Sequence, residues 1–118
     1  MTCDISYRDN VIVLALNGHL DLHSAPRLSQ EIQDVIREGA SKLVIDLAGV
    51  TYIDSSGIGV LLKVFGCTRR GEFRLRLCGV DGAVEHVIGL TKLTNYLPIS
   101  ADLSTAIADL DGETAVAT

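Results

Sequence analysis

The chain has 118 residues, of which 47% are hydrophobic, and its formal net charge is -5. This length suits one domain with a core of its own, and the hydrophobic content excludes a disordered chain. The negative charge is unfavourable for binding nucleic acid or an anionic membrane, and aromatic residues at 4% supply few rings for stacking on bases. The composition therefore predicts a single globular domain that binds neither.

The three cysteines, Cys3, Cys67 and Cys78, are far apart and form no Cys-x-x-Cys pair. This spacing indicates neither a metal site nor a disulfide framework, and we interpret them as small apolar side chains in a reducing cytoplasm. The N-terminus lacks the pattern of a signal peptide, and no apolar run approaches the ~20 residues of a membrane helix. We expect a cytoplasmic protein that needs no metal or cofactor.

The first half of the chain predicts a hairpin, a helix and a buried strand. The three strands cover residues 3–7, 11–16 and 42–47. Polar and apolar residues alternate in the first strand, and the Asp9-Asn10 turn before the second indicates an antiparallel hairpin. The helix is predicted to follow a Ser24 cap, with Pro26 in its first turn, and to end at Gly39. The third strand opens with an apolar run, typical of a strand buried on both faces, and a turn-rich segment follows it.

The second half predicts three helices and two strands. The helices run from a start at Asp54-Ser55 to about Arg69 or Arg70, from an Asp81 cap to about Gly89, and from a Ser100 cap to Gly112. Gly71 is the stop signal of the first of these helices. Residues 72–77 alternate cleanly, so this strand buries its apolar side chains and exposes Arg74 and Arg76. Residues 96–99 are expected to form a short edge strand, because Pro98 cannot donate to a ladder.

A hairpin followed by alternating strands and helices predicts a single α/β domain. We expect a mixed, mostly parallel sheet of four to five strands with about four helices, antiparallel only at its N-terminal hairpin. The predicted domain covers residues 1–112, and residues 113–118 are expected to form a frayed C-terminal tail.

The stretch that looks most functional is residues 54–57, Asp-Ser-Ser-Gly. Here a buried strand delivers two hydroxyls to the start of a helix, where an Asp or Ser side chain accepts from the first free N–H groups. A simple helix cap explains the aspartate and serine equally well. Gly57 and Gly59 favour a functional site, because each costs about 0.5–1 kcal/mol relative to Ala in a helix. That cost suggests that a backbone or another molecule approaches closely.

The spacing of the motif residues disfavours three enzymatic interpretations. An α/β hydrolase carries Gly-x-Ser-x-Gly at a strand-to-helix turn, but Ile53 and Asp54 stand where the first glycine belongs. Nothing in the sequence places a histidine near the serines. A Walker-type phosphate loop is absent, and Leu62 stands where a dinucleotide fingerprint starting at Gly57 needs its third glycine. We therefore predict a protein without catalytic residues.

Three segments together resemble the STAS domain family, and in particular its small single-domain bacterial anti-sigma factor antagonists. They are Gly-His-Leu-Asp at 18–21, Leu-Val-Ile-Asp-Leu at 43–47 and Tyr-Ile-Asp-Ser-Ser-Gly-Ile-Gly-Val at 52–60. The likeness covers nearly the whole chain in length, element order and motif spacing. His19 departs from the family pattern, which often has glutamate at that position.

The resemblance implies a partner switch. In that family the unphosphorylated protein binds a kinase-type anti-sigma factor, which then releases its sigma factor. The same kinase phosphorylates the antagonist on serine and so breaks the complex, and a metal-dependent phosphatase reverses the modification. The acceptor implied by the resemblance is Ser55, which the residues alone do not separate from Ser56. The expected partner contacts are Asp21, His23, Asp54, Ser56, Gly57 and Ile58.

STAS-like domains also serve as scaffold subunits of signalling assemblies and as cytoplasmic parts of transport systems, which remains the alternative function. For the switch, the physics of the modification is plain. A phosphate adds about -1.5 to -2 charges, and the N-terminus of a helix favours such an anion. Phosphorylation of Ser55 is therefore expected to leave the fold intact and to act on the docked partner.

Overall fold

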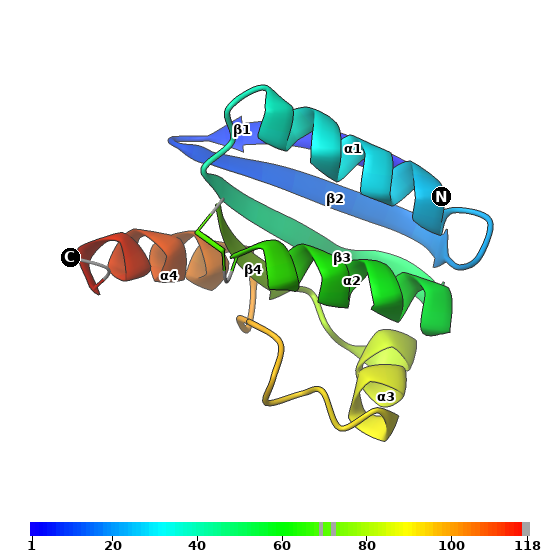
Figure 1. Cartoon of the computed structure of the whole chain (residues 1–118). Helices are drawn as coiled ribbons and strands as arrows, with labels where there is room; N and C mark the ends of the chain where they lie inside the picture. Colours follow the sequence, from blue (N-terminus) through cyan, green and yellow to red (C-terminus); the bar gives the residue numbers. More distant parts are fainter. Residues whose placement is uncertain (69, 72, 117–118) are drawn as a thin grey trace.

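A computed structural model describes residues 1–68, 70–71 and 73–116. Within these residues the chain forms four strands and four helices. Their order is β1 (Thr2–Arg8), β2 (Val11–Leu20), α1 (Ala25–Arg37), β3 (Lys42–Ile53), α2 (Ser55–Thr68), β4 (Arg74–Cys78), α3 (Gly82–Leu90) and α4 (Leu103–Val116). Figure 1 shows this arrangement, which confirms the predicted order of the elements.

The sheet has the strand order β1-β2-β3-β4. β1 and β2 pair antiparallel, whereas β3 runs parallel to both β2 and β4, so the predicted mixed sheet with an N-terminal hairpin is confirmed. The strand predicted at residues 96–99 is reduced to a single parallel bridge between Leu77 and Ile99. The N–H of Leu77 donates to the carbonyl of Pro98 at 2.8 Å, and the proline itself has no N–H to extend the ladder.

Helices cover both faces of the sheet. α1, α2 and α3 pack on one face over a core to which Leu28, Leu61 and Ile88 contribute. α4 packs on the other face, where Ala106 and Leu110 join a second, smaller apolar cluster. Successive side chains of β3 join the two clusters in turn: Leu43 and Ile45 belong to the first cluster and Val44 to the second. The apolar run therefore marks a strand buried on both faces, as predicted. In Figure 1, α1 and α2 lie side by side in front of the sheet.

The central strand is longer than predicted. The sequence indicated a turn-rich segment after residue 47, but β3 continues to Ile53. This extension pairs with β2, and the register between the two strands shifts twice, between Ala15 and Asn17 and between Gly18 and His19. The shifted pairing requires glycine at position 49, because the Cβ of any other residue would collide with the side chain of Asn17. The residues that indicated a turn therefore form an irregular part of the β2–β3 pairing.

Three predicted helix caps are wrong in detail. Ser24 and Asp81 stand at the N-cap positions of α1 and α3, but neither side chain bonds to its helix. Ser100 lies before α4, where Asp102 accepts from the N–H of Thr105 at 2.8 Å. Ser100 is instead buried, and its hydroxyl donates to Asp109 Oδ2 at 2.6 Å. This hydrogen bond attaches α4 to the segment beside β4.

The predicted ends of two helices need correction. α2 ends at Thr68, and the backbone turns at Gly71 with a φ of 78°. Arg69, one of its two predicted end points, lies outside the described residues. α4 continues through Gly112 to Val116, so residues 113–116 of the predicted tail are helical. The last two residues of that tail lie outside the described residues.

The α4 face explains two further differences. Arg74 and Arg76, predicted to be exposed, are half-buried, because they share the β4 face on which α4 packs. Cys78 lies on the same face and is fully buried, and this burial, followed by the nearby Asp46 carboxylate, raises the pKa of its thiol to about 12. Cys78 therefore acts as a small apolar side chain, as predicted.

Candidate functional site

The serine pair opens α2 directly after β3. Ser55 is the first residue of the helix and is exposed, whereas Ser56 is half-buried. Of the two predicted cap candidates, Asp54 caps the helix: its Oδ1 accepts from the N–H of Ser56 at 2.9 Å and from that of Gly57 at 3.2 Å. Ser55 is thus exposed at the electropositive end of α2.

Asp54 also joins α2 to the loop between β2 and α1. Its Oδ2 accepts from the N–H of Leu22 at 3.2 Å, and its own N–H donates to the carbonyl of Leu20 at 3.3 Å. β2 and β3 are parallel, so their carboxyl ends lie at one edge of the sheet. The two motifs, at residues 18–21 and 54–57, therefore form one site.

Asp21 and Ser24 hold the loop between β2 and α1 in shape. Asp21 Oδ1 accepts from the N–H of His23 at 2.9 Å and from that of Ser24 at 3.1 Å. The hydroxyl of Ser24 donates to the carbonyl of His19 at 2.7 Å instead of capping α1. The backbone N–H of Ser24 is the main reason that the pKa of Asp21 lies below its usual range. Asp21 therefore positions the exposed His23, and its carboxylate already has partners within the loop.

We expect Asp21→Asn to lower the melting temperature at neutral pH but not at strongly acidic pH. The pKa of Asp21 is depressed in the folded state, so its carboxylate stabilises the fold above the unfolded pKa of about 3.9. That contribution is lost as the pH falls through the lower, folded pKa. Thermal melts of both proteins between pH 7 and pH 2 check this, and a difference that is constant over the whole range would contradict it.

The predicted contacts Gly57 and Ile58 are both buried. A Cβ on Gly57 would lie 2.6 Å from the carbonyl oxygen of Leu20, so glycine lets α2 approach the end of β2 closely. Ile58 is only 5% exposed and belongs to the main core. These two residues therefore shape the helix start and offer little surface of their own.

Gly59 is exposed, and a Cβ there would meet nothing within 4 Å. Packing within the chain therefore gives no reason for a glycine at this position. Gly59 lines a hollow of about 290 Å³ between α1 and α2, together with Leu22, Pro26, Ser56 and Val60, with Lys63 at one end. We call this the docking hollow.

The sequence indicated a functional role for Gly59 but did not identify Leu22 or Lys63 as part of this surface. Leu22 is 67% exposed, which is unusual for a large apolar side chain beside polar loop residues. Gly59 and Lys63 follow Ser56 at i+3 and i+7, a spacing that places all three on one face of α2. That spacing was available in the sequence, but Leu22 joins the hollow only through the fold.

The enzymatic interpretations gain no support from the geometry. Among the described residues, no histidine hydrogen-bonds to Ser55 or Ser56, so the geometry shows no serine–histidine pair. In the same part of the chain, no group of three or more acidic, histidine or cysteine side chains is arranged to hold a metal ion. No described helix has the length and apolar composition needed to cross a membrane.

Comparisons with known proteins agree with this arrangement. The family model of the STAS domain matches residues 3–106. The anti-sigma-B factor antagonist of Bacillus subtilis (strain 168) is 30% identical over 98 residues, covering 83% of this chain and 89% of the relative. The crystal structure of an anti-sigma factor antagonist from Mycobacterium paratuberculosis is 28% identical, with a TM-score of 0.78 over 93% of each chain. The chain therefore belongs to the STAS domain family.

A third comparison concerns the fold alone. The Bacillus cell fate determinant SpoIIAA, solved in the phosphorylated form, is 19% identical. It matches with a TM-score of 0.68, covering 92% of this chain and 97% of SpoIIAA. The unphosphorylated form of SpoIIAA matches almost equally well, with a TM-score of 0.69. The same fold thus accommodates both states of that protein.

Proposed function

We propose that this protein is an anti-sigma factor antagonist that acts by partner switching in the cytoplasm. In its unphosphorylated form it binds a kinase-type anti-sigma factor, which then frees its sigma factor. The kinase phosphorylates Ser55, the complex dissociates, and a metal-dependent phosphatase restores the binding form. The observation that carries the proposal is the exposed Ser55 hydroxyl at the first residue of α2, beside the docking hollow.

The docking surface in this proposal combines the loop and the helix start. Leu22 supplies an exposed apolar anchor, and the open space over Gly59 accepts a side chain from the partner. His23 and Ser56 supply polar contacts at its edge, while Asp21 and Asp54 hold both segments in place. Central apolar anchors ringed by polar groups are typical of protein interfaces.

Phosphorylation acts on the interface in this mechanism. Asp54 already uses the N–H groups of Ser56 and Gly57, so a phosphate on Ser55 finds few free donors within the helix and lies near a carboxylate. The dianion therefore remains solvated while the protein is free. A partner that docks over Ser55 must remove that water, and the cost falls on binding.

The acceptor is tested by incubating the protein with ATP and candidate kinases and mapping the modified residue by mass spectrometry. We expect phosphate on Ser55, complete loss of modification in Ser55→Ala and retained modification in Ser56→Ala. Ser56→Ala is the matched control because it removes the neighbouring hydroxyl of the same helix turn. Full phosphorylation of Ser55→Ala would overturn the assignment.

A pull-down separates this role from the alternative. Co-purification with an ATP-binding kinase whose complex also contains a sigma factor supports the switch. Co-purification with a membrane permease and its ATPase, or with a large signalling assembly, supports a scaffold or transport role. Both outcomes are compatible with the STAS fold, which hosts more than one function.

A further inference from the structure

A second hollow lies in the groove between α1 and α2, further along α2 than the docking hollow. Its volume is about 250 Å³, and its walls come from both helices and from the residue before β4. Ile32 and Phe73 are only 3% and 4% exposed and close the bottom, while Ile36, Val64 and Cys67 form the sides. We call it the groove pocket. Such apolar walls offer water few hydrogen-bond partners and favour an apolar occupant.

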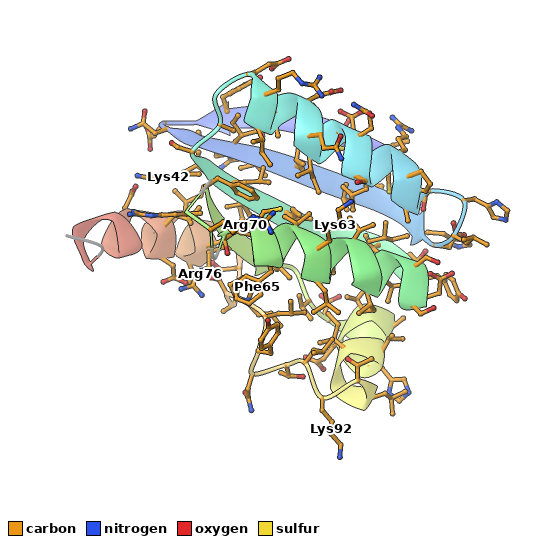
Figure 2. The ribbon with its side chains drawn as sticks, viewed as in Figure 1. Lys42, Lys63, Phe65, Arg70, Arg76 and Lys92 are labelled. Carbon is orange, nitrogen blue, oxygen red and sulfur yellow. The ribbon has the colours of Figure 1, made fainter. Side chains whose placement is uncertain are left out.

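Positive side chains surround the opening of the groove pocket. Lys63 and Arg37 line it, and Arg70 donates from Nη2 to Cys67 Sγ at 2.9 Å. Figure 2 shows Lys63 and Arg70 along the side of α2 that faces α1. Arg37 pairs with Asp34 at 3.3 Å, whereas Lys63 forms no ion pair with any described residue. The described lining of the pocket contains no acidic residue, although the chain carries a net charge of -5.

We propose that the groove pocket binds a small amphipathic carboxylate. Its hydrocarbon part occupies the apolar interior, and its carboxylate lies at the opening beside Lys63 and Arg37. An apolar cavity of about 150 Å³ admits benzene, so a hollow of this larger volume suits a chain of about eight carbons. A nucleotide suits it poorly, because its polar sugar and base would lie against the apolar interior. The site is formed by α1, α2 and Phe73 and does not depend on the proposed role of Ser55.

The probe is sodium octanoate, titrated below its micelle concentration into the ¹⁵N-labelled full chain and followed by amide chemical shifts. We expect saturable shifts centred on Ser29, Gln33, Lys63 and Cys67. Octylammonium has the same tail with the opposite charge, and acetate has the head group without the tail. We expect neither to produce these shifts, because binding requires both parts of the ligand.

Lys63→Gln is expected to raise the Kd for octanoate about 1.5- to fivefold, the effect of losing one solvent-exposed ion pair. Lys92→Gln is the matched control, because it removes the same charge from an exposed lysine after α3 (Figure 2). We expect it to leave the Kd unchanged. The amide spectra also report whether each variant is folded. Shifts that do not saturate, equal binding of octylammonium, or equal effects of the two substitutions would overturn the proposal.

Discussion

Phosphorylation of Ser55 is expected to weaken the complex with the anti-sigma partner by several hundred-fold while hardly changing the melting temperature. Ser55 is exposed beside the docking hollow, so docking must desolvate a dianion or place it against the partner. A loss of about 3–4 kcal/mol is sufficient for this decrease in affinity. Isothermal titration calorimetry of the phosphorylated and unphosphorylated proteins measures the change.

The fold itself is expected to tolerate the phosphate. Favourable interaction of an anion with the helix N-terminus is worth roughly 0.3–1 kcal/mol, and the neighbouring Asp54 carboxylate opposes it. We therefore expect the two forms to melt within a few degrees of each other. A phosphorylated protein that unfolds at much lower temperature would place the switch in the fold and not in the interface.

Aspartate at Ser55 and aspartate at Ser104 together distinguish an effect on the docking surface from an effect of net charge. Ser55→Asp is expected to weaken the complex less than the phosphate does, because it adds a single charge, and Ser55→Ala is expected to bind normally. Ser104→Asp is the matched control, since Ser104 is exposed in the first turn of α4 on the opposite face of the sheet. Equal weakening by the two aspartates would mean that net charge, and not the docking surface, governs the complex.

Alanine at Gly57 and at Gly59 is expected to have opposite effects on stability. Gly57→Ala should reduce the free energy of unfolding by about 1–3 kcal/mol, because its Cβ would lie 2.6 Å from the Leu20 carbonyl oxygen. Gly59→Ala should increase it by about 0.5–1 kcal/mol, because alanine favours the helix and meets no neighbour. Urea denaturation of both variants measures the difference.

Gly59→Ala is also expected to weaken partner binding, despite its greater stability, because its methyl group narrows the docking hollow. Gly66→Ala is the control for this effect. Gly66 also lies in α2 with open space around it, so alanine at this position should increase the free energy of unfolding similarly. Gly66 does not line the docking hollow. If Gly59→Ala binds the partner as tightly as Gly66→Ala does, the hollow is not where the partner docks.

Hydrophobic spacing was sufficient to predict most of the fold. The alternation in β1 and β4, and the i, i+3, i+4 spacing in α2, are local signals that identified the type of each element, although Ile5 and Tyr7 of β1 remain exposed. Boundaries and caps were less predictable, because they depend on neighbours distant in the chain. The extension of β3 to Ile53 depends on its pairing with β2, and Ser100 bonds to Asp109 rather than to its own helix.

The candidate site likewise combines features that the local sequence predicts with features that depend on the fold. The sequence by itself placed a helix start at residues 54–57, because an Asp or Ser side chain there can accept from the first free N–H groups. Only the tertiary structure decided that Gly57 serves internal packing while Gly59 is open, and that Leu22 reaches the same surface. The reason is that the parallel β2 and β3 bring their carboxyl ends together, a long-range contact that no local pattern of residues encodes.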